Sequence, residues 1–185
     1  IVLATFTNKA ARSMMSRVAD LMSADVSRLW GGTFHHLGHR SLRAHARRLG
    51  YENNFVIIDA DDAKQLVNRC LAEKVNNVGP KFPRGDVLRD IISFARNTDR
   101  RLEEVITDRF PYLNSYLEAI MAVANHYAGE KKRLNVMDFD DLIINWRLLL
   151  VDHEDVRTDY GERFRHVLVD EYQDTNIIQA DITDL

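Results

Sequence analysis

The chain has 185 residues, of which 45% are hydrophobic and 29% are charged, and its formal net charge is −3. These values are typical of a soluble globular protein with one domain, or with one domain that carries an insertion. The slightly acidic balance argues against a dedicated basic nucleic-acid module, although a local basic patch remains compatible with it. No apolar run reaches the about 18 residues of a transmembrane helix and no signal-peptide pattern is present, so we expect a cytoplasmic protein.

The chain opens with a predicted strand and a predicted helix. Residues 1–5 (IVLAT) form a short apolar run typical of a buried parallel strand. Thr7 or Asn8 can cap the next helix. Its apolar positions recur at helical spacing and predict a core face: Ala11, Met14, Met15, Val18, Leu21 and Met22.

A second helix, rich in basic residues, is predicted after residues 30–32 (WGG), where the helical pattern breaks. Thr33 can cap this helix, which continues to about residue 49 and carries four arginines and four histidines.

The middle of the chain predicts an inserted, mostly helical subdomain. Cys70 lies at a core spacing in its first helix, so we expect this thiol to be buried and structural. The expected elements, in chain order, are an extended piece at 53–58, a helix capped by Asp59 or Asp61, a proline-containing loop at 76–85, and helices near 87–95, 102–109 and 112–133.

After the insertion, Asp138 can cap a strongly apolar helix that reaches residue 150. A strand, a turn and a last helix, capped by Thr175 or Asn176, are predicted to follow. The chain starts within a strand and stops within a helix, so we expect it to be a piece of a longer protein.

Two adjacent carboxylates, Asp170 and Glu171, follow the apolar residues 167–169. Such a pair resists burial unless a cation or a proton compensates it, and parallel α/β sheets bind ligands at the carboxyl ends of their strands. Successive strand residues face opposite sides, so one acid can hold Mg²⁺ through water while the other approaches the water that attacks a phosphate. The alternative is an acidic turn in which Asp174 and Asn176 only cap the next helix.

The string VDEYQDTN (169–176) resembles motif II of the superfamily 1 DNA helicases of the UvrD, Rep and PcrA type. Three further segments agree with this family in the same order. LATFTNKAA (3–11) resembles motif Ia, GTFHHLG (32–38) resembles the next DNA-contacting motif, and DFDDLI (138–143) resembles the helix before the Walker B strand.

This resemblance implies an α/β fold: a partial RecA-like P-loop NTPase motor domain with few parallel strands and a mostly helical inserted subdomain. Residues 1–50 would be the first part of motor domain 1A with motifs Ia and Ib. Residues 51–133 would be subdomain 1B, and residues 134–185 would return to domain 1A with the Walker B motif.

The resemblance also implies roles for individual residues. Asp170 would support Mg²⁺ through water, Glu171 would be the general base, and Gln173 and Asp174 would support the ATP site. From spacing alone, Phe6 and Phe34 would be interpreted as core residues, but the family pattern assigns them to DNA. The residues implied to bind DNA are Phe6, Thr7, Asn8, Thr33, Phe34 and His35.

The intact parent would be an ATP-dependent 3'–5' DNA helicase of repair or replication, with ATP and Mg²⁺ as cofactors. Its partners would be single-stranded DNA, junctions of single- and double-stranded DNA, and repair or replication proteins. Nucleotide hydrolysis also needs a GxxxxGK[ST] loop. These 185 residues contain none, so the piece alone is predicted to be inactive. Three alternatives remain: the helicase subunit of a RecB- or AddA-like helicase-nuclease, a non-catalytic DNA- or protein-binding helical module, and a purely structural helical domain.

The histidines of the basic helix suggest a zinc site, because His35 and His39 lie four residues apart on one face. No HExxH pattern and no nearby cysteine accompanies them. We therefore expect a polar, locally cationic face, which is either solvated or beside a DNA phosphate.

Overall fold

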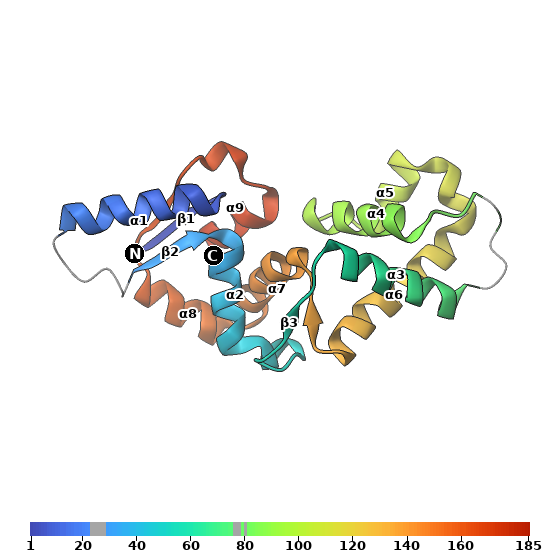
Figure 1. Ribbon diagram of the computed structural model, residues 1–185, viewed down its shortest axis with the longest axis horizontal. Helices are drawn as coiled ribbons and strands as arrows, with labels where there is room; N and C mark the ends of the chain where they lie inside the picture. The colour runs from blue at the N-terminus through green and yellow to red at the C-terminus, as the bar shows by residue number, and fades with distance from the viewer. Residues whose placement is uncertain (23–28, 76–78, 80) are drawn as a thin grey trace. The chain divides into compact units, whose positions relative to one another are not determined.

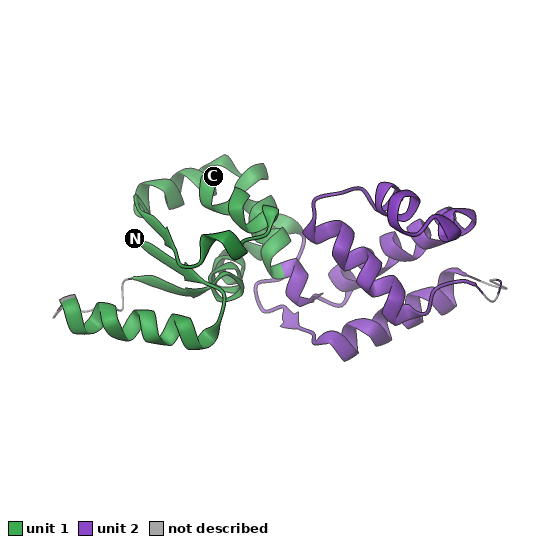
Figure 2. Cartoon of the chain, turned by 90° about the horizontal axis from the view of Figure 1, so that it is seen from above, with its two compact units in different colours: residues 1–49, 142–185 green, residues 50–141 purple. Residues whose placement is uncertain are grey.

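The computed structural model describes residues 1–22, 29–75, 79 and 81–185. The chain divides into two compact units, coloured separately in Figure 2. Unit 1 comprises Ile1–Leu49 and Leu142–Leu185, and unit 2 comprises Gly50–Asp141. The mixed α/β architecture with a few parallel strands confirms the predicted fold class. In the described ranges, no helix is long and apolar enough to span a bilayer.

Unit 1 contains a three-stranded parallel sheet in the order β2-β1-β5, of which β1 and β2 are labelled in Figure 1. Strand β1 (Val2–Thr5) is central and fully buried, and β5 (Val167–Val169) pairs with it in parallel. Both strands were predicted from their apolar runs, and both are confirmed. Strand β2 (Trp30–Thr33) completes the sheet on the other side of β1.

Strand β2 corrects the prediction that residues 30–32 form a break. The two glycines belong to the strand because neighbouring side chains occupy the space that a Cβ atom would need. A Cβ on Gly31 would collide with Sδ of Met15, and one on Gly32 would lie 2.8 Å from Cδ2 of His36. Glycine here therefore permits close packing of helices on a strand and does not mark a turn.

The first helices of unit 1 begin at the predicted caps. Helix α1 (Asn8–Met22) starts after Thr7, whose Oγ1 accepts a hydrogen bond from the backbone N–H of Ala10 at 3.1 Å. Helix α2 (Phe34–His45) starts after Thr33, whose hydroxyl accepts from the N–H of His36 at 3.2 Å. A 3₁₀ turn, η2 (Ala46–Leu49), extends α2.

The predicted core face of α1 is only partly buried. Ala11 is buried, and Met14, Met15 and Val18 are half-buried. Leu21 is 84% exposed, contrary to the prediction. The side chain of Met22 lies outside what the structure describes.

Three more helices complete unit 1, although the first residues of α7 (Phe139–Asp152) belong to unit 2. Helix α7 starts at the predicted Asp138, which exchanges hydrogen bonds with Asp141, and α9 (Ile177–Asp184) starts at Asn176 with a capping box to Gln179. Helix α8 (Glu154–Arg163) was not predicted. It is polar on nearly every side, and it is held by contacts that periodicity does not reveal. The ring of Tyr160 lies 5.6 Å from that of Trp30.

Unit 2 is a helical bundle with a short two-stranded parallel sheet, β3 (Val56–Ile57) and β4 (Val136–Met137). Its core joins all of its α-helices around fully buried apolar residues, which include Cys70, as predicted. Burial raises the pKa of the Cys70 thiol. Residues 76–78 and 80 of the expected loop lie outside the described residues. The α-helices are α3 (Ala60–Lys74), α4 (Gly85–Asn97), α5 (Leu102–Arg109) and α6 (Leu117–Arg133), with a 3₁₀ helix η3 (Pro111–Tyr116) between the last two.

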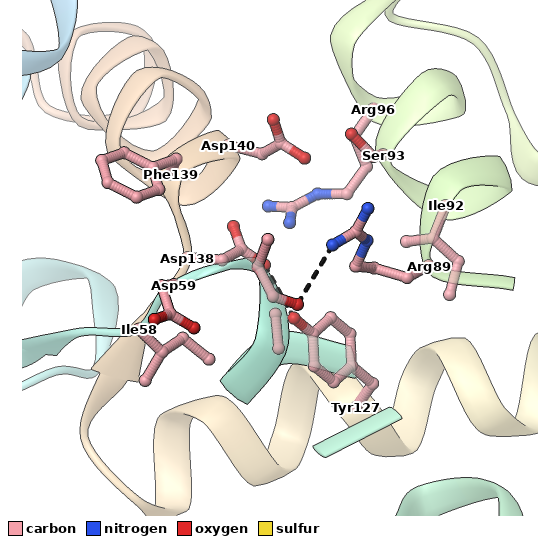
Figure 3. Close-up of a pocket in the computed structure, with 12 residues that line it drawn as sticks. Ile58, Asp59, Arg89, Ile92, Ser93, Arg96, Tyr127, Asp138, Phe139 and Asp140 are labelled. Carbon is pink, nitrogen blue, oxygen red and sulfur yellow. Dashed lines mark hydrogen bonds between the residues drawn. The ribbon is translucent and has the colours of Figure 1, made fainter. Parts of the chain in front are cut away.

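A buried ionic cluster ties the start of α7 to α4 and α6. Nζ of Lys131 lies 2.6 Å from carboxylate oxygens of both Asp138 and Asp141. Arg96 reaches the other oxygen of Asp141 at 2.7 Å, and the hydroxyl of Tyr127 donates to Asp138 at 2.9 Å. Figure 3 shows Arg96, Tyr127 and Asp138 around a cavity of about 210 Å³. Strand β4 and this cluster belong to the bundle, and unit 2 extends to Asp141. The end of the inserted subdomain at residue 133 stays a prediction.

The cluster makes unit 2 sensitive to acid. Burial disfavours the charge of Asp138, but Lys131 and Arg96 outweigh this effect and hold the pKa of Asp138 at about 2. In the unfolded chain this pKa is about 3.9. The unfolded state therefore takes up a proton first, so this stabilisation is complete above pH ~4 and is lost as the pH falls towards 2.

We expect the urea midpoint of unit 2, followed by hydrogen exchange of amides in α4 and α6, to decrease as the pH is lowered from ~4 to ~2. The variant Asp138→Asn should be less stable at pH 7, and its midpoint should depend less on pH in this window. An identical pH dependence in wild type and variant would contradict the assignment to Asp138.

Candidate functional site at the carboxyl edge of the sheet

The three parallel strands of unit 1 deliver all the predicted site residues to one edge. In the register of the sheet, Thr5 pairs with Thr33 and Ala4 pairs with Val169. The backbone N–H of Asp170 continues this ladder and donates to the carbonyl of Ala4 at 2.9 Å. The segments that leave the strands therefore start side by side at about 4.8 Å per strand, with the β1 segment between the other two.

The two acids occupy a sharp turn after β5. Asp170 and Glu171 are both exposed, and the backbone of Glu171 is left-handed, with φ 55° and ψ 47°. This conformation is uncommon for a residue with a side chain, and it reverses the chain into the 3₁₀ turn η4 (Tyr172–Asp174). Gln173 Nε2 donates a hydrogen bond to the carboxylate of Glu171. The turn thus presents two carboxylates to solvent and orients one of them through its neighbour.

The alternative, an acidic turn in which Asp174 and Asn176 only cap the next helix, applies to one of these two residues. Asn176 caps α9, as that alternative supposed, whereas Asp174 belongs to η4 and is exposed. Asp170 also lines an open groove of about 530 Å³ between α1 and the sheet, together with Arg17 and Leu168. Asp170 therefore borders space that a ligand can enter.

Phe6 and Phe34 pack against each other at the same edge. Their ring centroids are 5.8 Å apart and the rings are tilted by 48°. Phe34 is only 1% exposed, whereas Phe6 is half-buried. One ring is thus a support in the core, and the other keeps part of its surface accessible.

The other predicted DNA contacts also divide into accessible and buried side chains. Thr7 and Asn8 are exposed and His35 is half-buried at the start of α2. Thr33 is 8% exposed, and its hydroxyl caps α2. A direct contact of DNA with the side chains of Thr33 or Phe34 stays a prediction, because the free chain uses both internally.

The basic helix is engaged largely within unit 1. The guanidinium of Arg40 lies 4.4 Å above the ring of Trp30, and Arg48 makes two hydrogen bonds to Asp155 at 2.6 and 3.0 Å. His39 accepts a hydrogen bond from Arg43 at 2.8 Å, and burial, followed by Arg43, lowers the pKa of His39. Several cations of this face thus also contact other side chains of unit 1, and the role of the face stays a prediction. Within the described ranges, no group of three or more metal-ligating side chains is placed to hold an ion.

Two further side chains lie near this edge. Arg12 and His36 line an open hollow between α1 and β2. Their placement was not foreseen because residues 30–32 were interpreted as a break, so no strand was expected between the two helices. His36 lies within the motif at 32–38, whereas Arg12 follows the motif at 3–11, and neither motif gave a reason to choose them.

The parallel sheet, the acids at its carboxyl edge and the helical insertion define a partial RecA-like domain. The family of the UvrD/REP helicase N-terminal domain matches residues 1–185, and the chain belongs to this family. This match confirms the resemblance seen in the motifs.

Full-length comparison with curated proteins agrees with the family. The chain is 37% identical over 186 residues to the ATP-dependent DNA helicase PcrA of Leuconostoc citreum, covering 100% of the chain and 24% of that protein. It is 35% identical over 183 residues to UvrD1 of Mycobacterium bovis, covering 97% of the chain and 23% of that helicase. Identity to PcrA of Staphylococcus aureus is 33% over 185 residues, 100% of the chain and 25% of that protein. The chain thus spans about a quarter of the length of these relatives.

Proposed function

We propose that this chain is part of an ATP-dependent DNA helicase that moves 3' to 5' on single-stranded DNA and unwinds duplexes in repair or replication. The observation that carries the proposal is the meeting of Phe6, His35 and the pair Asp170–Glu171 at one edge of a parallel sheet. Its substrates would be single-stranded DNA and junctions with duplex DNA in the cytoplasm, where repair or replication proteins would meet it. Unit 2 would be subdomain 1B, inserted between the two parts of motor domain 1A.

The exposed acids fit a magnesium nucleotide. Mg²⁺ takes one or two carboxylates together with phosphate oxygens and water, and Asp170 and Glu171 supply carboxylate oxygens at an accessible edge. Bound Mg²⁺ would neutralise phosphate charge. Asp170 would hold the ion through water, and Glu171 would take a proton from the attacking water. Gln173 would keep the Glu171 carboxylate oriented, while Asp174 would support the ATP site from the same turn.

The accessible side chains around Phe6 would form the track for single-stranded DNA. A base would stack on Phe6, and Thr7, Asn8 and His35 would meet the neighbouring backbone. Phe34 and Thr33 would support the track without touching solvent. Phe34 packs against the ring of Phe6, and the side chain of Thr33 caps the start of α2. Strand β1 leads to this track and is hydrogen-bonded to the strand that carries the acids, which supports a direct link between nucleotide and DNA.

Replacing Phe6 with alanine in the full-length protein tests the proposed track. Base stacking on an aromatic ring contributes about 1–3 kcal/mol, so we expect the Kd for a fluorescent oligo-dT to rise by roughly 5- to 150-fold. Phe6→Tyr retains a ring and should bind nearly as well as wild type. DNA-stimulated ATPase and unwinding of a duplex with a 3' tail test the activity itself.

Tyr112→Ala is the matched control, because Tyr112 is 61% exposed and lies in unit 2. If Phe6→Ala and Tyr112→Ala raise the Kd for oligo-dT equally, Phe6 does not form the proposed stacking site. If the wild-type protein neither binds single-stranded DNA nor hydrolyses ATP, the proposed function is wrong.

A further inference from the structure

A cavity of about 100 Å³ lies inside unit 1, between the sheet and helices α2, α7, α8 and α9. We call it the indole pocket, because Trp30 and Trp146 both line it. Its floor is one row of the sheet, since Trp30 of β2 and Val167 of β5 both pair with Val2 of β1. This row is the first of the sheet, so the floor lies at the amino edge, opposite to the edge that carries Asp170.

The wall of the indole pocket is mostly apolar. The ring centroid of Trp30 lies 4.9 Å from that of Phe164 and 5.6 Å from that of Tyr160, so aromatic contacts hold the indole in place. Buried Leu37 and Leu150 close the pocket from α2 and α7. An apolar cavity of about 150 Å³ admits benzene in another protein, so this smaller pocket suits an alkyl group of about four carbons.

Two unused hydrogen-bond donors belong to the indole pocket. Trp30 and Trp146 are 5% and 7% exposed, and the Nε1 atom of neither has a hydrogen-bond partner among the described residues. An indole can only donate, and a buried donor without an acceptor is unfavourable. The two hydroxyls that line the pocket, those of Tyr160 and Thr183, already have partners in unit 1. The pocket therefore lacks an acceptor, which a ligand can supply.

Arg157 of α8 brings a positive charge to the indole pocket. Its Nη1 atom donates to the carbonyls of Leu150 at 2.9 Å and Val151 at 3.3 Å, which holds the guanidinium at the end of α7. Its other two nitrogens have no hydrogen bond to a described residue, and Arg157 makes no ion pair within the described ranges. The guanidinium thus keeps donors for a ligand.

The charges around the indole pocket favour an anion. No side-chain carboxylate is among the described residues that line it. The guanidiniums of Arg40 and Arg163 lie 4.4 and 5.3 Å from the ring centroid of Trp30, and within the part of the chain that the structure describes neither forms an ion pair. Two acids of α8, Asp159 and Glu162, are exposed and do not line the pocket.

We propose that the indole pocket binds a small monocarboxylate with a branched alkyl group of about four carbons. The alkyl group packs between the sheet and Leu37, and the carboxylate accepts hydrogen bonds from Arg157 and from the indole donors of Trp30 and Trp146. A planar carboxylate matches the parallel N–H donors of a guanidinium, which makes it a better partner than a neutral acceptor. None of these side chains is proposed to contact nucleotide or DNA, so the site does not depend on the proposed function.

Fluorine NMR of the full-length protein labelled with fluorotryptophan tests this site. The resonances of Trp30 and Trp146 are assigned with Trp30→Phe and Trp146→Phe, and the probes are isovalerate, its neutral isostere isoamyl alcohol and the cation isoamylammonium. We expect both resonances to shift saturably with isovalerate. Its Kd should be roughly 10-fold lower than that of the alcohol, because a charge-assisted hydrogen bond is gained. The ammonium ion should cause no saturable shift.

Arg157→Met is expected to raise the Kd for isovalerate about 10-fold and to leave the Kd for isoamyl alcohol unchanged, so the alcohol shows that the variant keeps its pocket. Arg157→Lys retains a charge and should retain the preference for the carboxylate.

The control is Arg165→Gln, which removes the same charge from an exposed residue that does not line the pocket. Its Kd values should equal those of the wild type. If neither tryptophan resonance shifts with isovalerate, or if wild type and Arg157→Met bind isovalerate equally, the inference is wrong. Equal Kd values for isovalerate and isoamyl alcohol in the wild type would refute it as well.

Discussion

Replacing Glu171 with glutamine in the full-length protein is expected to lower kcat for ATP hydrolysis by roughly 10²- to 10⁴-fold, the range that a positioned general base contributes. The substitution keeps the size of the side chain and removes only its ability to take a proton. Binding of single-stranded DNA should be retained, because Glu171 lies in the turn after β5 and outside the Phe6 track. Steady-state turnover with saturating oligo-dT is the measurement.

The control for this experiment is Glu162→Gln, an exposed glutamate near the end of α8. It should leave kcat within about twofold of wild type. The 185-residue chain by itself should show no turnover, since it contains no GxxxxGK[ST] loop. A kcat for Glu171→Gln close to that of Glu162→Gln would rule out the role of general base.

The substitution Lys131→Met is expected to destabilise unit 2 strongly. The Lys131 side chain is 2% exposed and lies between Asp138 and Asp141, so its removal leaves two buried carboxylates with less compensating charge. Removing one partner of a buried ion pair costs about 3–5 kcal/mol, and we expect a loss of this size in the free energy of unfolding of unit 2. The double variant Lys131→Met/Asp138→Asn should recover part of that loss.

The neighbouring Lys132 provides the control, because it belongs to the same helix but is exposed. Lys132→Met should cost less than about 1 kcal/mol. Both tryptophans, Trp30 and Trp146, lie in unit 1, so their fluorescence follows unit 1, while hydrogen exchange in α4 and α6 follows unit 2. A loss below 1 kcal/mol for Lys131→Met would contradict the importance of the cluster.

Local sequence signals predicted the parts of the fold that depend on short-range chemistry. The apolar runs located β1 and β5, and Thr33, Asp59, Asp138 and Asn176 begin helices as their side chains indicated. Each of these signals requires only a few neighbouring residues, so it can be recognised without knowledge of tertiary contacts.

The elements that sequence analysis missed depend on contacts between distant segments. Strand β2 contains two glycines, which pattern rules assign to turns, and it is a strand because Met15 and His36 pack on it. Helix α8 has almost no apolar stripe, and Tyr160 anchors it to Trp30 and to Ser41. The periodicity of apolar residues along the sequence does not predict such contacts between distant residues.

In the candidate site, too, local motifs predicted some features, whereas others depend on contacts between distant segments. The motifs identified Asp170, Glu171 and Phe6, but they did not distinguish accessible from buried members. Thr33 and Phe34 are internal, while Arg12 and His36 line a hollow that is visible only once β2 is placed between the helices. Side-chain identity follows from sequence, whereas exposure depends on the packing of the surrounding elements.

Strand β5 has a structural consequence for the acids that follow it. Among the described residues it pairs only with β1, and Val167 and Leu168 are 42% and 57% exposed despite being apolar. A further parallel strand on its outer side would lie about 4.8 Å away and would end level with Asp170. The loop after such a strand would direct its amide groups at any phosphate held beside the carboxylates, as helix starts do in other α/β proteins. One added segment would thus cover the exposed edge of this apolar strand.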